Sequence, residues 1–176
     1  SGGMIKVNVS GKADVVMTTK GDIVTYSTER VRKAVGNNSQ ILVCDSSETD
    51  GNKYDDNTTS FVVACSDETT DLETGDDKAQ IRLPFQFELT SISANVNTAP
   101  TGSTISIQVQ EDGSDILSTP ITIDASETTS ETAGVPPVIS DSTLASNSII
   151  SFDLDQIGSS TAGTGLKINL IGYRVV

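Results

Sequence analysis

Apolar and polar residues alternate with a period of two through most of the chain beyond residue 66. Because successive side chains of a strand point to opposite faces, this alternation predicts strands that each place one face in a core. Residues that favour strands are frequent throughout, and no long amphipathic helix is apparent. Five segments carry the pattern: 80–96, 103–110, 116–123, 147–157 and 166–175.

Turn-forming residues separate these segments. The Asp112-Gly113 pair is a strong hairpin signal. Inside the first segment the parity changes between Leu89 and Ile92, which predicts a bulge or a bend, with Pro84 at a strand edge. Strands spaced in this way predict an all-β fold whose C-terminal part is an antiparallel β-sandwich or jelly-roll.

The stretch from Thr18 to Tyr54 has a different character. It contains two short strand-like runs, each followed by a glycine turn, and it carries little apolar surface. Such a segment folds poorly alone and gains stability from neighbouring copies of itself, so the pattern favours an oligomeric, fibre-like protein over a monomeric enzyme. Residues 28–34 are the best helical candidate, and they also fit an extended conformation.

These patterns divide the chain into three parts. Residues 1–3, before Met4, are interpreted as an expression-tag remnant. Residues 4–60 are predicted to form an N-terminal extended β arm for assembly or attachment, and its polar, acidic end at 46–60 is a linker or long loop. Residues 61–176 are predicted to form the β-sandwich domain, which is large enough to enclose its own core.

The charge balance argues against several classes of partner. The chain has 24 acidic and 11 basic residues and a net charge of -13, so we expect no binding to nucleic acid or to an anionic membrane surface. No apolar run is long enough for a membrane helix, so no membrane insertion is expected. The chain has no His, the usual general base and the commonest neutral metal ligand. We therefore expect no enzyme, no catalytic residue and no cofactor.

The acidic residues offer oxygen ligands, but no metal site is assigned. Asp153 and Asp155 flank Leu154, which places both carboxylates opposite the core in a strand. This pair is interpreted as a solvated strand face, and calcium binding is the alternative. The acidic loops 50–56 and 111–115 do not match an EF-hand spacing, so they are weak calcium candidates.

The two cysteines, Cys44 and Cys65, both lie in strand-like apolar runs. Free cysteine behaves as a small apolar residue, so this context favours two buried free thiols. A disulfide between them stays open, because a strand context does not exclude it.

The arm contains the only basic cluster, formed by Arg30, Arg32 and Lys33. The cluster is a candidate for docking the arm on an acidic partner such as a capsid or neck surface. The alternative is local charge balance against Glu29 and Asp22, which the sequence favours.

Aromatic residues are scarce, and Tyr26 is the one in the arm that we assign to assembly. Sugar-binding sites often use aromatic platforms, so the scarcity argues mildly against a dedicated carbohydrate site. We interpret Tyr26 as an inter-subunit packing residue. The adhesion-like tripeptide at 20–22 (KGD) is interpreted as a turn, in which the glycine relieves the backbone.

Short motifs in both halves of the chain resemble modules of phage virion proteins. In the arm they are TKGDIVTYS at 19–27, VR at 31–32, VG at 35–36, QIL at 40–42 and DSS at 45–47. This set resembles a module widespread in tailed-phage virion proteins, especially tail and head fibres. The C-terminal region resembles a second phage-associated module. The matching motifs are DETTDL at 67–72, TG at 74–75, RLPF at 82–85, TAPTGS at 98–103, SDILST at 114–119, IDA at 123–125 and GTGLK at 163–167.

The resemblance implies a trimeric β-structured component of a tailed-phage virion. It implies a homotrimer located in the virion, other virion proteins of the capsid, neck or tail as partners, and a host-surface glycan as a further partner. The chain is short for a tail fibre that reaches from baseplate to host. This length favours a small spike, a head fibre or a capsid decoration protein.

Three alternatives remain beside the fibre or spike interpretation. A capsid decoration or cement protein would clamp neighbouring capsomers and bind purified empty capsids without binding host cells. A carbohydrate-binding module would show saturable binding on a glycan array. A carboxylate-based hydrolase is the least favoured, and it would lose activity when one acidic pair is changed.

Overall fold

The structure is a computed structural model that describes residues 18–26, 30–37 and 39–175. Apart from one 3-10 turn at Ser130–Thr132 (η1), every regular element in these ranges is a strand, so the all-β prediction is confirmed. No helix in the same ranges is long and apolar enough to cross a membrane. The chain divides into two compact units, Ser1–Asn57 and Thr58–Val176, called here the N-terminal unit and the C-terminal unit. The predicted tag remnant at 1–3 lies outside the described residues.

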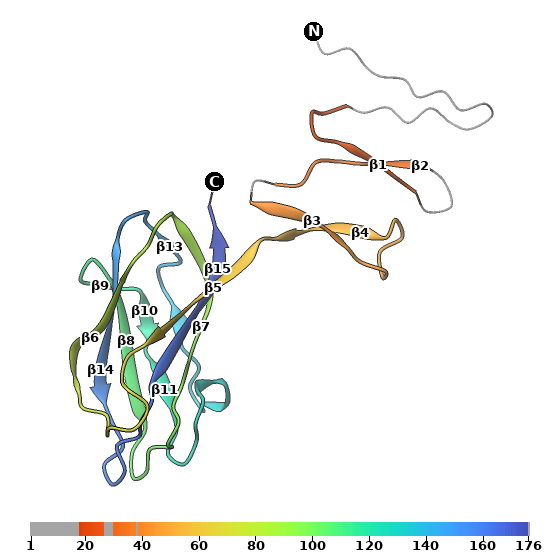
Figure 1. Cartoon of the computed structure of the whole chain (residues 1–176). Helices are drawn as coiled ribbons and strands as arrows, with labels where there is room; N and C mark the ends of the chain where they lie inside the picture. The colour runs from red at the N-terminus through yellow and green to blue at the C-terminus, as the bar shows by residue number, and fades with distance from the viewer. Residues whose placement is uncertain (1–17, 27–29, 38, 176) are drawn as a thin grey trace, which may run out of the picture. The chain divides into compact units, whose positions relative to one another are not determined.

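The N-terminal unit contains two antiparallel hairpins (Figure 1). β1 (Ile23–Tyr26) pairs with β2 (Arg30–Lys33), and β3 (Gln40–Cys44) pairs with β4 (Asn52–Asp56). Segment 28–34, which the sequence left open between helix and strand, is extended over β2, and residues 28 and 29 lie outside the described ranges. Each hairpin is a separate two-stranded sheet.

The C-terminal unit contains one five-stranded and one four-stranded antiparallel sheet, and a short pair. The five-stranded sheet has the order β11 (Ile121–Ile123), β8 (Ile105–Glu111), β14 (Ile149–Gln156), β6 (Gly75–Arg82), with β9 (Ser114–Asp115) also on β8. The four-stranded sheet has the order β13 (Thr143–Leu144), β7 (Phe87–Asn95), β15 (Lys167–Arg174), β5 (Thr58–Ala64). The short pair is β10 (Leu117–Thr119) with β12 (Val138–Ile139). Within this unit, β6, β14 and β8 lie together at the left of Figure 1 and β7, β15 and β5 at the right.

The two larger sheets contribute to one hydrophobic core. Val109 of β8 and Phe152 of β14 are at most 1% exposed, as are Phe87 of β7 and Leu170 of β15. The ring of Phe61 on β5 stands edge-on to that of Phe87, with the ring centroids 5.2 Å apart. The alternation in the sequence correctly predicted these inward faces. Each fully buried side chain of this size contributes about 1.5–3 kcal/mol to stability.

Segment 80–96 forms two strands, whereas the sequence analysis treated it as one. The chain leaves β6 at Arg82 and enters β7 at Phe87, and the two strands lie in different sheets. Pro84 lies in the turn between them, where its missing N–H costs no ladder hydrogen bond. The predicted bulge is confirmed, because Ile171 pairs with Ser91 and Gly172 with Leu89, which leaves Thr90 as the extra residue.

Two other turn signals have clear outcomes. Asp112 and Gly113 have φ angles of 47° and 83° and connect β8 to β9 in a two-residue hairpin, as their sequence predicts. The segment 116–123 was expected to be one strand, but it is interrupted at Pro120. Its two pieces, β10 and β11, pair in different sheets.

Candidate assembly surface

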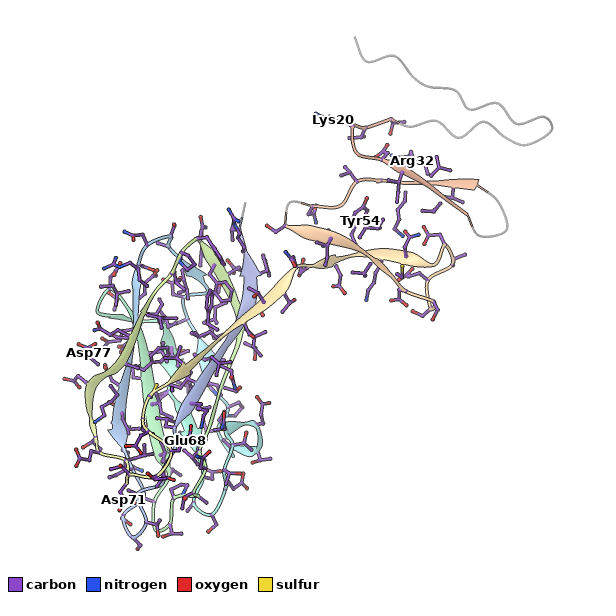
Figure 2. All side chains as sticks on the ribbon, in the orientation of Figure 1. Lys20, Arg32, Tyr54, Glu68, Asp71 and Asp77 are labelled. Carbon is purple, nitrogen blue, oxygen red and sulfur yellow. The ribbon has the colours of Figure 1, made fainter. Side chains whose placement is uncertain are left out.

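The four arm residues proposed from the sequence all lie on the first hairpin. Tyr26 and Arg30 are opposite each other in the β1–β2 register, at the end where the chain passes from β1 to β2. The side chains of these two residues lie outside the described part of the structure. Arg32 and Lys33 follow on β2 (Figure 2), and as neighbours in a strand they point to opposite faces.

Arg32 pairs with a buried carboxylate of its own unit. Its Nη1 lies 2.9 Å from Oδ2 of Asp22, whose side chain is fully buried. The same carboxylate accepts the backbone N–H groups of Thr18, Thr19 and Val35, at 3.0, 2.8 and 3.1 Å. The Arg32 hydrogen bond, with these backbone donors, holds the pKa of Asp22 well below its usual range, although burial opposes the shift. Asp22 therefore anchors the start of β1 to the end of β2.

The turn that precedes Asp22 explains why this carboxylate reaches so many donors. Gly21 has a φ of 94°, a conformation that glycine adopts without strain. The N–H of Asp22 donates to the carbonyl oxygen of Thr19 at 3.2 Å, which closes the turn. The tripeptide at 20–22 thus forms a turn, in line with the sequence interpretation. The carboxylate of Asp22 forms its hydrogen bonds and its ion pair with residues of the same unit.

Lys33 connects the first hairpin to the second. Its Nζ lies 3.0 Å from Oδ2 of Asp50 and donates to the carbonyl oxygen of Asn52 at 2.6 Å. Thr25, on the same face of the hairpin as Lys33, donates its hydroxyl to Asp50 Oδ2 at 3.0 Å. The Lys33 hydrogen bond lowers the pKa of Asp50 against the opposing effect of burial. A polar staple formed by Thr25, Lys33 and Asp50 therefore joins the two hairpins.

A close aromatic approach adds to this staple. Tyr54 projects from β4 toward Gly36, and a Cβ at position 36 would lie 2.6 Å from its ring (Figure 2). The Asn37 N–H donates to the side-chain oxygen of Gln40 at 2.9 Å, which orders the start of β3. The Tyr54 ring leaves no room for a side chain at position 36, so replacement of Gly36 by alanine would displace that ring.

The N-terminal unit leaves its apolar side chains exposed. Among its described residues no apolar side chain is buried, and the two buried residues are Asp22 and Thr25. Large apolar residues are 44–46% exposed at five positions: Val24, Val31, Val35, Ile41 and Leu42. We call these five residues the arm apolar set. The set was not identified from the sequence, where only a general shortage of apolar surface was apparent.

The arm apolar set covers both faces of each hairpin. In the first hairpin Val24 is opposite Arg32 and Val31 is opposite Thr25, so the two valines lie on different faces. In the second hairpin Ile41 and Leu42 are adjacent in β3 and so also point to different faces. A partner that covers these side chains must therefore contact the hairpins from more than one side.

The acidic candidates of the C-terminal unit have structural partners. Asp153 is buried, where the sequence analysis expected a solvated face, and its Oδ1 accepts the N–H of Asp77 at 2.7 Å. The burial follows because β14 is an inner strand between β8 and β6. Asp155 is exposed as a whole residue. Partial burial of its carboxyl, and then the negative charges of Asp153, Asp115 and Asp76, raise its pKa. In the described part of the chain, no group of three or more acidic or cysteine side chains is arranged to hold a metal ion.

Both cysteines are free thiols, and they differ in burial. Cys65 is buried as expected, and burial raises the pKa of its thiol to about 12. Such a thiol stays protonated at neutral pH and is a poor nucleophile. Cys44 is exposed, which is contrary to the expectation of two buried thiols. The reason is that β3 belongs to a two-stranded hairpin and has no sheet to cover it.

Two cavities of the C-terminal unit have different linings. A cavity of about 280 Å³ is bordered by Thr90, Ser91, Ile92, Ser130, Glu131, Pro136, Pro137 and Ile139, and Glu131 is the only ionisable residue of that lining. The second, of about 250 Å³, has the charged residues Asp67, Asp71, Glu73 and Lys78 in its lining, and the Asp67 carboxylate accepts the N–H groups of Thr69 and Thr70 at 2.8 and 2.7 Å. These hydrogen bonds, that of Thr70 first, lower the pKa of Asp67 to about 2.

Comparison with known proteins adds no assignment. A scan against protein-family models found no match for this chain, and searches of curated proteins and of solved structures found none either. The function is therefore argued from the residues and their geometry, together with the sequence motifs already described.

Proposed function

We propose that this chain is a structural protein of a tailed-phage virion, which assembles as a homotrimeric fibre or spike appendage. In this proposal the N-terminal unit is the assembly and attachment arm, and the C-terminal unit projects from the particle as a β-sandwich of the jelly-roll kind. The observation that carries the proposal is the arm apolar set, which is exposed on a unit without a buried apolar residue among those described.

Physical reasoning from the hairpins supports the assembly role. An isolated two-stranded hairpin is marginally stable in water. The ion pairs of the N-terminal unit add little net stability, because surface pairs are worth about 0–1 kcal/mol each and the buried carboxylate of Asp22 loses hydration that its pairing with Arg32 must offset. Burying the arm apolar set against other copies would supply the missing hydrophobic stabilisation. Because the set lies on both faces of each hairpin, copies that surround one another fit it better than one flat docking surface.

The proposed sandwich rests on the shared core of the two larger sheets. Inward residues of β8 and β14 belong to the same apolar cluster as inward residues of β7 and β15. Two sheets with such a common core pack face to face in sandwich folds. A rigid unit of this kind can present loops to a host-surface glycan, which stays part of the proposal as an expected partner. No catalysis is proposed.

The decisive test is the mass in solution. Light scattering coupled to gel filtration should give three times 18.4 kDa for the full chain at micromolar concentration. A mass near 18.4 kDa would overturn the proposal.

A pair of variants tests whether the arm apolar set makes the assembly. Val24→Ser with Val31→Ser should weaken association by roughly a hundredfold, because burying each valine contributes about 1.5 kcal/mol. The matched control is Val135→Ser with Val138→Ser, which changes two valines of the C-terminal unit that are 58% and 49% exposed. Equal association of the two double variants would contradict the proposed role of the arm.

Binding of the protein to purified empty capsids, without binding to host cells, would favour the decoration alternative.

A further inference from the structure

The two larger sheets of the C-terminal unit have five edge strands, and four of them are protected against pairing with another chain. β9 and β13 have two residues each and β11 has three, which is too short for a stable ladder. β6 carries charged residues, including the consecutive Asp76, Asp77 and Lys78, and its register with β14 is irregular. Short length, charge and bulges are the devices by which natural sheets avoid edge-to-edge association.

β5 has none of these devices. Its seven residues, TTSFVVA, include no charged residue and no proline, and its register with β15 is regular from Thr58 to Ala64. The side chain of Val62 faces solvent and is 64% exposed, the largest value among the exposed large apolar residues of the described chain. No strand in the part of the chain that the structure describes pairs with its outer edge. A regular, uncharged and apolar edge of this length is a ready template for strand addition.

The direction of the backbone groups on β5 follows from one hydrogen bond. The Cys65 N–H donates to the carbonyl oxygen of Leu166 at 2.9 Å, so Cys65 faces β15 with both of its backbone groups. In an antiparallel ladder this property alternates, so Val63 and Phe61 also face β15. The backbone groups of Ser60, Val62 and Ala64 consequently point away from β15, toward the free edge.

We propose that the outer edge of β5, from Ser60 to Ala64, pairs with β3 of a second copy of this chain. This inference rests on the proposed trimer and names the contact that links its subunits. A copy is favoured as the occupant because the arm apolar set, which the proposed trimer buries, includes Ile41 and Leu42 of β3. Both strands are uncharged, so their pairing brings no further like charges together where two chains of net charge -13 meet. β3, QILVC, is uncharged and belongs to a two-stranded sheet, and its Ile41 and Leu42 are 44% and 46% exposed.

Symmetry also favours β3 over a second β5. Pairing of β5 with β5 would be two-fold and would close a dimer, whereas pairing of two different edges is head-to-tail and can close a three-membered ring. β1 is uncharged as well, but it has four residues against five in β3. The longer strand offers the better ladder for residues 60–64 of β5.

The test is amide hydrogen exchange of the full chain, measured residue by residue by NMR beside the mass from light scattering. We expect Ser60, Val62 and Ala64 to exchange about fivefold more slowly at high than at low protein concentration, because one hydrogen bond is worth about 1 kcal/mol. The amides of Phe61, Val63 and Cys65 face β15, so they should be protected at both concentrations and provide an internal control. In a mixture of labelled and unlabelled copies, contacts from β5 should reach residues 41–43 of the other copy.

Two variants separate the backbone contact from the side chain. Val62→Pro removes the N–H that points to the outer edge without removing a hydrogen bond to β15, so it should weaken association about fivefold. Val62→Thr keeps that N–H and the β-branched shape, and it should associate like the wild type. Protection of the Phe61 and Val63 amides in both variants reports that β5 is still folded.

The outcomes distinguish this inference from the proposed function. A trimer in which the three outward amides exchange fast at all concentrations overturns the β5 contact and leaves the trimer standing. Outward amides that are protected in a monomer, or intermolecular contacts from β5 to a strand other than β3, also overturn it. The two-concentration experiment on the wild type decides the matter even if the proline variant does not fold.

Discussion

The two units of this chain use different means to hold their strands together. The C-terminal unit encloses a continuous apolar core, which includes Phe87, Phe152 and Ile168. The N-terminal unit buries no apolar side chain among its described residues, and four of the five ion pairs found in the described chain lie within it. The C-terminal unit has one, between Lys167 and Glu68.

This difference separates what each unit can do alone. Burial of apolar surface is roughly additive over a core and supplies most of the stability of a domain. Ion pairs orient strands but add little net free energy, because water and salt screen the exposed ones and desolvation offsets the buried ones. The C-terminal unit therefore has the contacts of an independently folding domain, whereas the N-terminal unit has no comparable apolar burial among its described residues.

The largest effect is expected where the core is densest. Phe87→Ala should destabilise the C-terminal unit by about 3–5 kcal/mol, because the ring is fully buried and its removal leaves a cavity beside Phe61. The measurement is the midpoint of denaturant unfolding, followed by a signal from the C-terminal unit. Phe85→Ala is the matched control, since Phe85 is half-buried and its ring lies 6.1 Å from that of Phe61. Equal losses in both variants would show that the core does not decide the stability of this unit.

Much of the C-terminal unit could be predicted from the sequence because its information is local. Alternation identified the buried faces of β8, β14 and β15, and a parity change located the bulge at Thr90. The errors arose where a proline divides an otherwise regular pattern. Pro84 and Pro120 each end one strand and allow the next to join another sheet, and periodicity alone does not report which sheet a strand joins.

The candidate assembly surface was less predictable, because its contacts join residues distant in sequence. Arg32 and Lys33 were identified as a basic cluster, but their acceptors are Asp22 and Asp50, which lie 10 and 17 residues away along the chain. The sequence analysis favoured charge balance of the cluster against Glu29 and Asp22, and the Arg32–Asp22 ion pair bears out the Asp22 part. It treated Asp50 only as part of an acidic loop. The exposure of Cys44 was also missed, because a strand-like run does not show whether a second sheet will cover it.

A smaller and local effect should follow from breaking the anchor of the first hairpin. Asp22→Asn removes the charge that Arg32 pairs with, so we expect the amides of Thr19 and Val35 to exchange about tenfold faster. The unfolding midpoint of the C-terminal unit should not change. Glu48→Gln, an equal charge change at an exposed position of the same unit, is the control. If the C-terminal unit lost stability with Asp22→Asn, the two units would not be independent in the way their contacts indicate.

The smallest expected effect is a difference in acid sensitivity, and its direction follows from the shifted pKa values. In the N-terminal unit the pKa values of Asp22, Asp45 and Asp50 are lowered, first by hydrogen bonds from Arg32, Ser47 and Lys33 respectively. A carboxyl whose pKa is lower in the folded state stabilises that state above its unfolded pKa, near 3.9, and the stabilisation is lost as the pH falls through the folded value.

The C-terminal unit should resist acid better, because its shifted carboxyls have opposing effects. Asp67, with a pKa of about 2, and Glu68, whose pKa is lowered first by the Lys167 hydrogen bond, lose their contributions as the pH falls below about 4, whereas protonation of Asp155, whose pKa is raised, relieves repulsion from Asp153. In an NMR titration from pH 7 to pH ~2.5, the amide signals of Thr25 and Val35 should therefore shift or broaden before those of Phe87 and Ile168. Simultaneous loss of both groups of signals would mean that the core and the ion pairs respond to acid as one cooperative unit, and the contrast between the two units would then fail at its most sensitive point.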